Sequence, residues 1–197
     1  MKNFLFLLLV LAQISFAENV LKLKIVATVN EDPITNIDVN NQIKFLKSMY
    51  DNNLKNEQIY NTAINNLIDE NIKTNEIKKN KLTTDNEKIN KQYNIILQDL
   101  QKKNKFLEED FKKELYKKVK IEIEWNEIVL KKYFWKININ IKEIEEKLKT
   151  KENNTNNEKN FLEKDKLISF EKNKKLQFYS NKYLEDLKET SLIKFYK

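Results

Sequence analysis

The side chains with acid–base chemistry in this sequence are almost all carboxylates and lysines. The chain holds 30 Asp and Glu residues and 37 basic residues, and every basic residue is Lys. Two carboxylates at a fixed separation can hydrolyse a glycosidic bond, so a carboxylate-pair hydrolase is formally open. The spacing argues against it, because Glu and Lys alternate at helical intervals, as in residues 143–147. That pattern is typical of a solvated helical face.

The residue types that carry most enzyme and cofactor chemistry are absent. His, Cys and Gly each number zero among the 197 residues. Without His or Cys the sequence lacks the commonest general base, the thiolate nucleophile and the usual metal ligands. Without Gly it cannot form the loops that cradle phosphates or dinucleotides. We therefore expect no enzyme activity, no catalytic residue, no metal and no cofactor.

The formal net charge of +7 raises the question of nucleic-acid binding. A nucleic-acid binder concentrates Arg and Lys on one face, often with Gly-rich loops or aromatic platforms. Here Lys is mixed with Glu along the helices, and the abundance of Lys, Asn and Ile is typical of an AT-rich genome. We expect no nucleic-acid partner. Steep salt dependence of binding would mark the alternative, a binder of nucleic acid or another anionic surface.

The first residues have the layout of a secretory signal peptide. Lys2 gives a short positive region, residues 4–11 form an unbroken apolar run, and Ser15 and Ala17 place small residues where a signal peptidase reads them. The run is shorter than the ~20 residues that span a bilayer, so we expect cleavage after Ala17 and no stable membrane insertion afterwards. The mature protein is expected to start at Glu18, with a net charge of +6 once Lys2 is removed.

Apolar periodicity predicts a mainly α fold with a few short strands from the two ends of the mature chain. Residues 24–29 are β-rich, and residues 33–35 can return as a second strand after a turn. Apolar residues then recur at three- and four-residue steps, which predicts amphipathic helices. The expected helices cover approximately residues 35–53, 57–80, 84–100, 111–133, 140–148 and 161–189, and residues 191–196 alternate like a strand.

Local signals suggest where helices start and how the chain is organised. Capping boxes are predicted at Thr35 with Asp38 and at Thr84 with Glu87. Residues 149–160 are polar, Asn-rich and without an apolar side chain, so we predict a linker there. Isolated strands leave backbone groups unpaired, so the end strands are expected to meet in one small sheet. The expected parts are a signal peptide over residues 1–17, a helical module over 18–148, the linker over 149–160, and residues 161–197 docked back on the module.

Several segments, taken in order, carry a family resemblance. Residues 26–35 read VATVNEDPIT, residues 63–76 read AINNLIDENIKTNE, and residues 82–89 read LTTDNEKI. Each is similar to a segment of the SurA-type periplasmic chaperones, in which they follow a signal peptide. Residues 106–133 look like the next helix of that family, and residues 183–195 look like its returning C-terminal segment. The resemblance covers residues 24–148 and 166–196, and it lies in the order of the motifs, since no single motif is specific.

The resemblance implies a SurA-like helical chaperone core in the periplasm that holds unfolded outer-membrane or other envelope polypeptides without ATP. Many family members carry parvulin-type prolyl isomerase domains between the two matching parts. Such a domain relies on an active-site His and on Gly-bearing loops, and it is far longer than residues 149–160, which stand in its place here. The implied protein is therefore the chaperone core without the isomerase.

A holding chaperone needs exposed apolar surface that shields extended client segments. Aromatic residues near helix ends and breaks are the candidates for client binding: Tyr50, Phe106, Tyr133, Phe134 and Trp135. For any one of them, packing in the core is the favoured alternative, because large aromatics dominate core energetics. The same fold could instead serve as a dedicated assembly or structural factor that binds one envelope partner at fixed stoichiometry.

Overall fold

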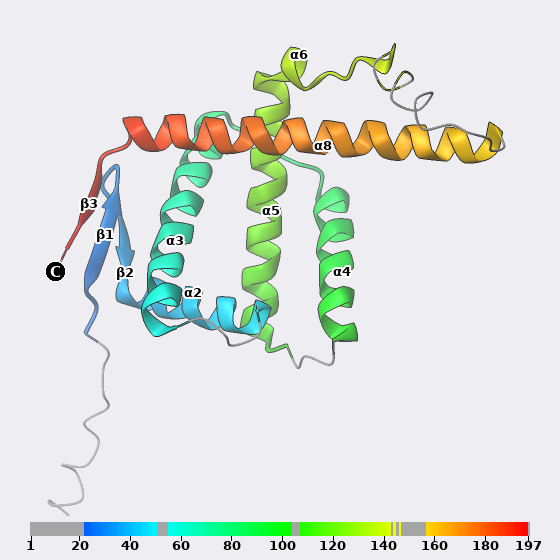
Figure 1. Cartoon of the computed structure of the whole chain (residues 1–197). Helices are drawn as coiled ribbons and strands as arrows, with labels where there is room; N and C mark the ends of the chain where they lie inside the picture. Colours follow the sequence, from blue (N-terminus) through cyan, green and yellow to red (C-terminus); the bar gives the residue numbers. More distant parts are fainter. Residues whose placement is uncertain are drawn as a thin grey trace, which may run out of the picture.

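The computed structural model describes residues 22–50, 55–103, 107–142, 144, 146 and 157–196. Within these residues long helices dominate, and three short strands gather at one end (Figure 1). The prediction of a mainly α fold with short strands from the two ends is confirmed. In chain order the elements are β1 (Ile25–Val29), β2 (Asp32–Thr35), α2 (Asn36–Met49), α3 (Asn56–Lys79), α4 (Asn86–Lys102), α5 (Glu109–Lys132), α6 (Phe134–Ile137), α8 (Asn157–Thr190) and β3 (Ile193–Phe195).

One small antiparallel sheet joins the two ends of the described chain. Its strand order is β2-β1-β3, so β1 is central, and Ala27 of β1 lies opposite Phe195 of β3. The predicted meeting of the end strands is therefore confirmed. Asn30, in the β1–β2 turn, strengthens it from both its backbone and its side chain. The N–H of Asn30 donates to the carbonyl of Leu192 at 3.0 Å, and Oδ1 of Asn30 accepts from the Leu192 N–H at 2.8 Å.

The chain makes its left-handed turns without glycine. Asn30 and Glu31 close the hairpin with φ of 48° and 77°, and Lys81 follows α3 with φ of 49°. Positive φ at both residues of a two-residue loop matches the twist of the flanking strands, and Asn is favoured there. Glu31 and Lys81 carry a Cβ in a region that glycine occupies without steric cost. Replacing either residue with Gly should therefore stabilise the fold.

The first described helix, α2, starts at the predicted capping box. The hydroxyl of Thr35 accepts from the Asp38 N–H at 3.2 Å, and Oδ2 of Asp38 accepts from the Thr35 N–H at 2.8 Å. Each side chain thus satisfies a backbone donor that the helix leaves free. At the other end the N–H of Tyr50 donates to the carbonyl of Leu46 at 2.9 Å.

The predicted capping box at the start of α4 is wrong. Asp85 is the N-cap instead, and its Oδ1 accepts from the Glu87 N–H at 2.9 Å. Thr84 donates its hydroxyl to Oε2 of Glu127 on α5 at 2.9 Å, and Lys88 bonds Oε1 of the same carboxylate at 2.6 Å. The Thr84 hydroxyl therefore bonds to Glu127 on α5 and does not cap α4 as the sequence spacing predicted.

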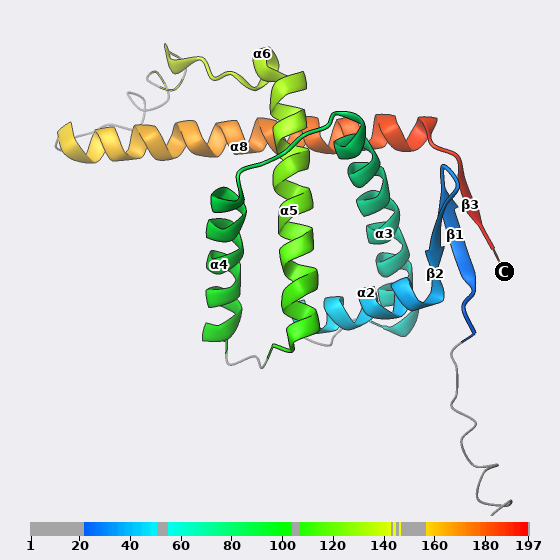
Figure 2. The same ribbon diagram turned by 180° about the vertical axis from the view of Figure 1, so that it is seen from behind.

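The helices surround α5, which runs through the middle of the helical part (Figures 1 and 2). α3 and α4 lie on either side of it, and α8 passes in front of it in Figure 1 and behind it in Figure 2. The main core joins the sheet to α2, α3, α5 and α8 and buries Ala27, Val29 and Trp125 completely. A second cluster lies chiefly between α4 and α5 around Ile89, which is also fully buried.

α8 is held on α5 by a row of aromatic rings. Trp125 is completely buried, and its ring stacks on Tyr183 of α8 at 5.2 Å between centroids. Tyr183 meets Tyr133 edge-on at 6.0 Å, and Tyr133 stacks on Tyr179 at 4.9 Å. The indole N–H of Trp125 donates to the hydroxyl of Ser180 at 2.8 Å, so the row also contains a buried hydrogen bond. Stacked and edge-on pairs at such distances add specific stabilisation to area burial.

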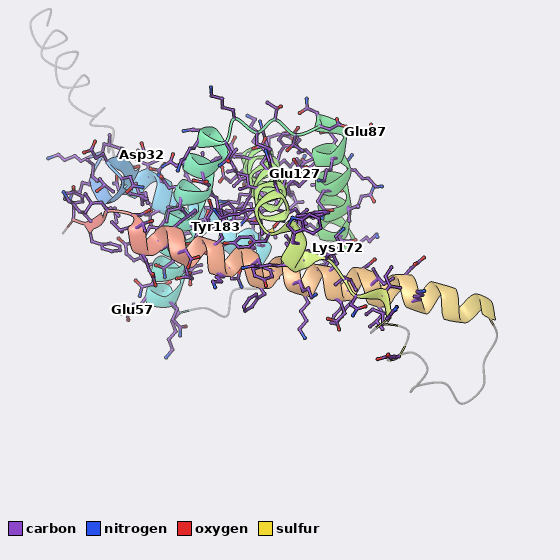
Figure 3. All side chains as sticks on the ribbon, turned by 90° about the horizontal axis from the view of Figure 1, so that it is seen from above. Asp32, Glu57, Glu87, Glu127, Lys172 and Tyr183 are labelled. Atoms are coloured by element: carbon purple, nitrogen blue, oxygen red, sulfur yellow. The ribbon has the colours of Figure 1, made fainter. Side chains whose placement is uncertain are left out.

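Two polar contacts join α8 to α3. Tyr183, labelled on α8 in Figure 3, donates its hydroxyl to Glu76 at 2.7 Å. Burial, together with that carboxylate, raises the pKa of the Tyr183 phenol, so the hydroxyl stays protonated and remains a donor. Lys188 pairs with Asp69 at 2.8 Å. The C-terminal half of α8 is thus fixed to two helices.

The N-terminal half of α8 extends well beyond its crossing with α5 (Figure 1). α8 begins at Asn157, so its first turn lies within residues 149–160, the stretch expected as a linker. A polar stretch can continue a helix whose packing is provided farther along, because propagation adds one hydrogen bond per residue fixed. Residues 149–156 lie outside the described part of the chain.

Candidate binding surface

Aromatic side chains gather where α6 meets α8, and several of them face solvent. The name aromatic surface is used below for Tyr133, Phe134, Trp135, Phe178 and Tyr179. Trp135 is 85% exposed, Phe178 61% and Phe134 56%. Phe134 meets Trp135 edge-on at 5.2 Å, and Phe178 meets Tyr179 edge-on at 5.1 Å. The stacked rings of Tyr133 and Tyr179 link the two pairs. Large exposed apolar side chains gathered in this way are typical of an interaction site.

A helix break and helical periodicity explain why these rings are exposed. α5 ends at Lys132, and the single turn of α6 that follows carries Phe134 and Trp135 out of the α5 stripe. On α8, Tyr179 packs against the core, and Phe178, one residue earlier, points about 100° away from that direction. The base of the surface is rigid because Tyr133 and Tyr179 stack on each other.

The aromatic surface also has a cation at its base. The ammonium of Lys136 lies 5.8 Å from the ring centroid of Tyr133 and 5.9 Å from that of Tyr179. Both distances are within the range of cation–π attraction. Burial is the main cause that raises the pKa of the Tyr133 phenol, so this ring stays neutral at physiological pH. The surface therefore offers neutral rings beside the ammonium of Lys136.

The structure places the five predicted client-binding residues in three different situations. Tyr133, Phe134 and Trp135 belong to the aromatic surface, with Tyr133 half-buried at its base. Tyr50 is 59% exposed at the end of α2, away from that surface, and lines the groove described next. Phe106 lies outside the described residues. Phe178 was not predicted, and its only sequence signal is an apolar residue one position off the helical stripe.

A groove of about 820 Å³ opens between α2, α3, α4, α5 and α8. Its lining residues come from all five helices, and α5 supplies the largest share. Ile95 of α4 is the most exposed of its aliphatic side chains. The apolar lining consists of Phe45, Leu46, Met49, Tyr50, Ile95, Ile96, Leu115, Val119, Ile121, Ile123, Leu130 and Leu176.

The charges around the groove are balanced and mostly paired. Four lysines and four carboxylates line it. Lys73 pairs with Glu122, and Lys88 pairs with Glu127 at 2.6 Å. The groove therefore has almost no net charge and is unsuited to a strongly charged occupant.

Glu70 is the most strongly held of these carboxylates. It contacts Lys117 at 2.6 Å and Lys118 at 2.5 Å. Burial alone would raise the pKa of Glu70, but Lys118 and Lys117 outweigh it and hold the pKa below its usual range. Glu70 is therefore ionised at neutral pH and ties α3 to α5.

The side-chain oxygen of Gln42 in the groove accepts no hydrogen bond from the described residues. Gln42 of α2 is only 4% exposed, and its Oε1 is buried with no hydrogen-bond partner among the described residues. A buried, unsatisfied amide oxygen destabilises a fold by about 1–3 kcal/mol. Such groups are rare in native structures, and each one calls for a physical reason.

Other kinds of site were sought in the same part of the chain. Among the described residues, no three acidic side chains come close enough together to hold a metal ion. Within the same ranges no helix combines the length and apolarity needed to cross a bilayer. No protein-family model matches the sequence, and a comparison with curated proteins finds no match.

Proposed function

We propose that this protein is a periplasmic, ATP-independent holding chaperone for unfolded outer-membrane or other envelope polypeptides. The observation that carries the proposal is the aromatic surface. Trp135, Phe178 and Phe134 are each more than half exposed at the junction of two helices. Single exposed apolar residues need no explanation, whereas a cluster of large ones on a rigid base favours binding of apolar partners.

The physics of the surface suits weak binding of many sequences. Aromatic rings supply large contact area at low conformational entropy cost, since each has only two side-chain torsions. Barrel proteins carry alternating apolar residues that are exposed until the barrel closes in the outer membrane. Contacts between rings and such residues need no specific sequence. Release needs no nucleotide, because each contact is weak and the client leaves when it folds.

The proposed location rests on the sequence rather than on the fold. The layout of Lys2, the apolar run over residues 4–11 and Ala17 favours export and cleavage before Glu18. The resemblance to SurA-type chaperone cores points to the same compartment. Mass spectrometry of the mature protein should find Glu18 as its first residue. An intact Met1 on a membrane-bound form would contradict this part of the proposal.

Suppression of aggregation tests the function. The mature protein should keep a urea-unfolded barrel protein soluble after dilution, at an equimolar or higher ratio and without ATP. Replacing both Phe134 and Trp135 with Ala should weaken client affinity at least tenfold, because buried interface aromatics contribute ~2 kcal/mol or more each. Phe195→Ala is the matched control, since Phe195 is 65% exposed but lies on β3, away from the aromatic surface.

Three further measurements separate the alternatives. The variant with both Phe134 and Trp135 replaced by Ala should melt at the same temperature as the wild type. A large drop would mean that these residues stabilise the fold and that the binding site lies elsewhere. Binding should weaken only modestly with salt, whereas an electrostatic binder would lose orders of magnitude in affinity. Failure to suppress aggregation of any barrel protein, together with tight binding of one envelope protein at fixed stoichiometry, would favour the dedicated assembly factor instead.

A further inference from the structure

The buried amide of Gln42 gives the groove a chemical preference. Its Oε1 is an acceptor without a partner among the described residues. The rest of the groove is lined by aliphatic and aromatic side chains, four lysines, four carboxylates and the amides of Asn66, Gln92, Asn126 and Asn173. An occupant that donates a hydrogen bond to this oxygen removes the destabilisation, whereas one without a donor leaves it in place. The groove is therefore expected to discriminate between apolar occupants by whether they carry a donor.

This requirement separates three classes of apolar occupant. A lipid acyl chain carries no donor at all. A helix interior has its backbone N–H groups already bonded within the helix, so it presents none to Gln42. An extended polypeptide has free N–H groups along its length, with side chains on alternate sides that can face Phe45 and Val119. Of the three, only the extended segment offers free main-chain donors to the unpaired acceptor together with apolar side chains for the lining.

Charge and flexibility agree with such an occupant. Lys73, Lys88, Lys91 and Lys118 are matched by an equal number of lining carboxylates, so the lining has no net formal charge, which suits a neutral segment. Because Oε1 of Gln42 is buried, groove side chains must part locally to admit a backbone. Met49 on the same helix is unbranched and adaptable, which suits that movement.

We propose that the groove binds one extended, apolar, uncharged client segment, and that Gln42 accepts a hydrogen bond from a main-chain N–H of that segment. The inference rests on the proposed function for the identity of its occupant. The groove is then a second binding site, separate from the aromatic surface, and the segment bound there is extended. Gln42 is a specificity-determining residue in this account, retained although it destabilises the free protein.

Backbone N-methylation of a peptide tests the hydrogen bond, because it removes one donor and leaves every side chain in place. The probe is a fluorescent peptide of about ten residues, the length of a barrel strand, with alternating Phe and Thr. A set of variants carries one N-methyl group at each position in turn. In the wild-type protein one position should weaken binding on the order of tenfold, and the others much less. In Gln42→Met the same N-methyl group should have no effect.

Gln92→Met is the matched control. Gln92 lines the same groove from α4 but is exposed, so its amide is solvated. This variant should keep the full sensitivity to N-methylation. Gln42→Met should also unfold at higher urea concentration than the wild type, which shows that any loss of peptide binding does not come from misfolding.

The outcomes distinguish the inference from the proposed function. Equal N-methyl sensitivity in wild type and Gln42→Met would overturn the inference, even if the protein still suppresses aggregation. Tighter binding of a lauroyl chain or of a preformed helical peptide than of the extended probe would also overturn it. Loss of aggregation suppression with the N-methyl pattern intact would sink the holding function and leave the groove as an extended-peptide site.

Discussion

The hydrogen bond between Trp125 and Ser180 offers a quantitative test of how α8 is held on α5. The indole N–H donates to the serine hydroxyl at 2.8 Å, both residues are buried, and Tyr183 stacks on the indole. Ser180→Ala leaves the indole N–H buried without an acceptor, which should lower the free energy of unfolding by about 2 kcal/mol. Trp125→Phe removes the donor and part of the ring, and it should lower it by about 2–3 kcal/mol.

The two losses share one interaction, so the double variant should be little worse than Trp125→Phe alone. The expected coupling free energy is about 1–2 kcal/mol. Urea unfolding followed by far-UV circular dichroism measures all four proteins, with stabilities from linear extrapolation. Ser169→Ala, at an exposed serine of α8, is the control and should change stability by less than about 0.5 kcal/mol. Strict additivity of the two losses would refute the interaction and with it the described docking of α8.

Three further predictions concern a turn and two carboxylates. Lys81→Gly should raise the free energy of unfolding by up to about 1 kcal/mol in urea titrations, because Lys81 has a φ of 49°; a loss of stability would contradict the turn geometry. Burial, partly offset by Lys120, raises the pKa of Glu124 in the folded protein. Folding therefore opposes its ionisation, so Glu124→Gln should melt about 2–4 °C higher at pH 7 and show no gain well below the ordinary carboxyl pKa of 4.5. Its lysine pairs lower the pKa of Glu70, so they stabilise the fold fully above the ordinary carboxyl pKa of 4.5. This stabilisation is lost as the pH falls through the lowered pKa of Glu70. Thermal melts should show Glu70→Gln destabilised by about 1 kcal/mol at pH 7 and equal to wild type in strong acid.

Much of the fold follows from local patterns. The β-rich segment, the turn at Asn30, the capping box at Thr35 and the helical periodicity each specify an element from a few neighbouring residues. The pairing of β1 with β3 also follows from sequence, because isolated strands leave backbone groups that need partners. The local features depend on short-range geometry, whereas the β1–β3 pairing joins the two ends of the chain and follows from the need of each strand for a partner.

What sequence did not specify depends on tertiary partners. α2 has apolar residues on two overlapping faces, and packing against α3 and α5 selects Val39, Gln42 and Leu46 as its buried residues. Ile37, an apolar residue on the same helix, is 39% exposed. Gln42 is therefore buried by its position on the helix and not by its chemistry. Helical spacing places Gln42 on the face of Val39 and Leu46, but a polar side chain gives no apolar signal there.

The candidate site shows the same division. Helix ends and breaks led to the prediction of Tyr133, Phe134 and Trp135, and Phe134 and Trp135 are exposed in the structure, because a break takes side chains out of a buried stripe. The contribution of Phe178 required the crossing of α8 over α5, a contact between residues far apart in the chain. The groove likewise exists only once five helices are assembled.

Site-specific photocrosslinking tests the central claim, that unfolded envelope polypeptides bind at the aromatic surface, most directly. Trp135 is replaced by a photoreactive phenylalanine in one protein and Phe195 in another, and each is mixed with a purified, urea-unfolded barrel protein and irradiated. We expect strong crosslinks from position 135 that disappear when the barrel protein is folded in detergent, and weak ones from position 195. Equal crosslinking from the two positions, or none from position 135 while aggregation is still suppressed, would contradict the account.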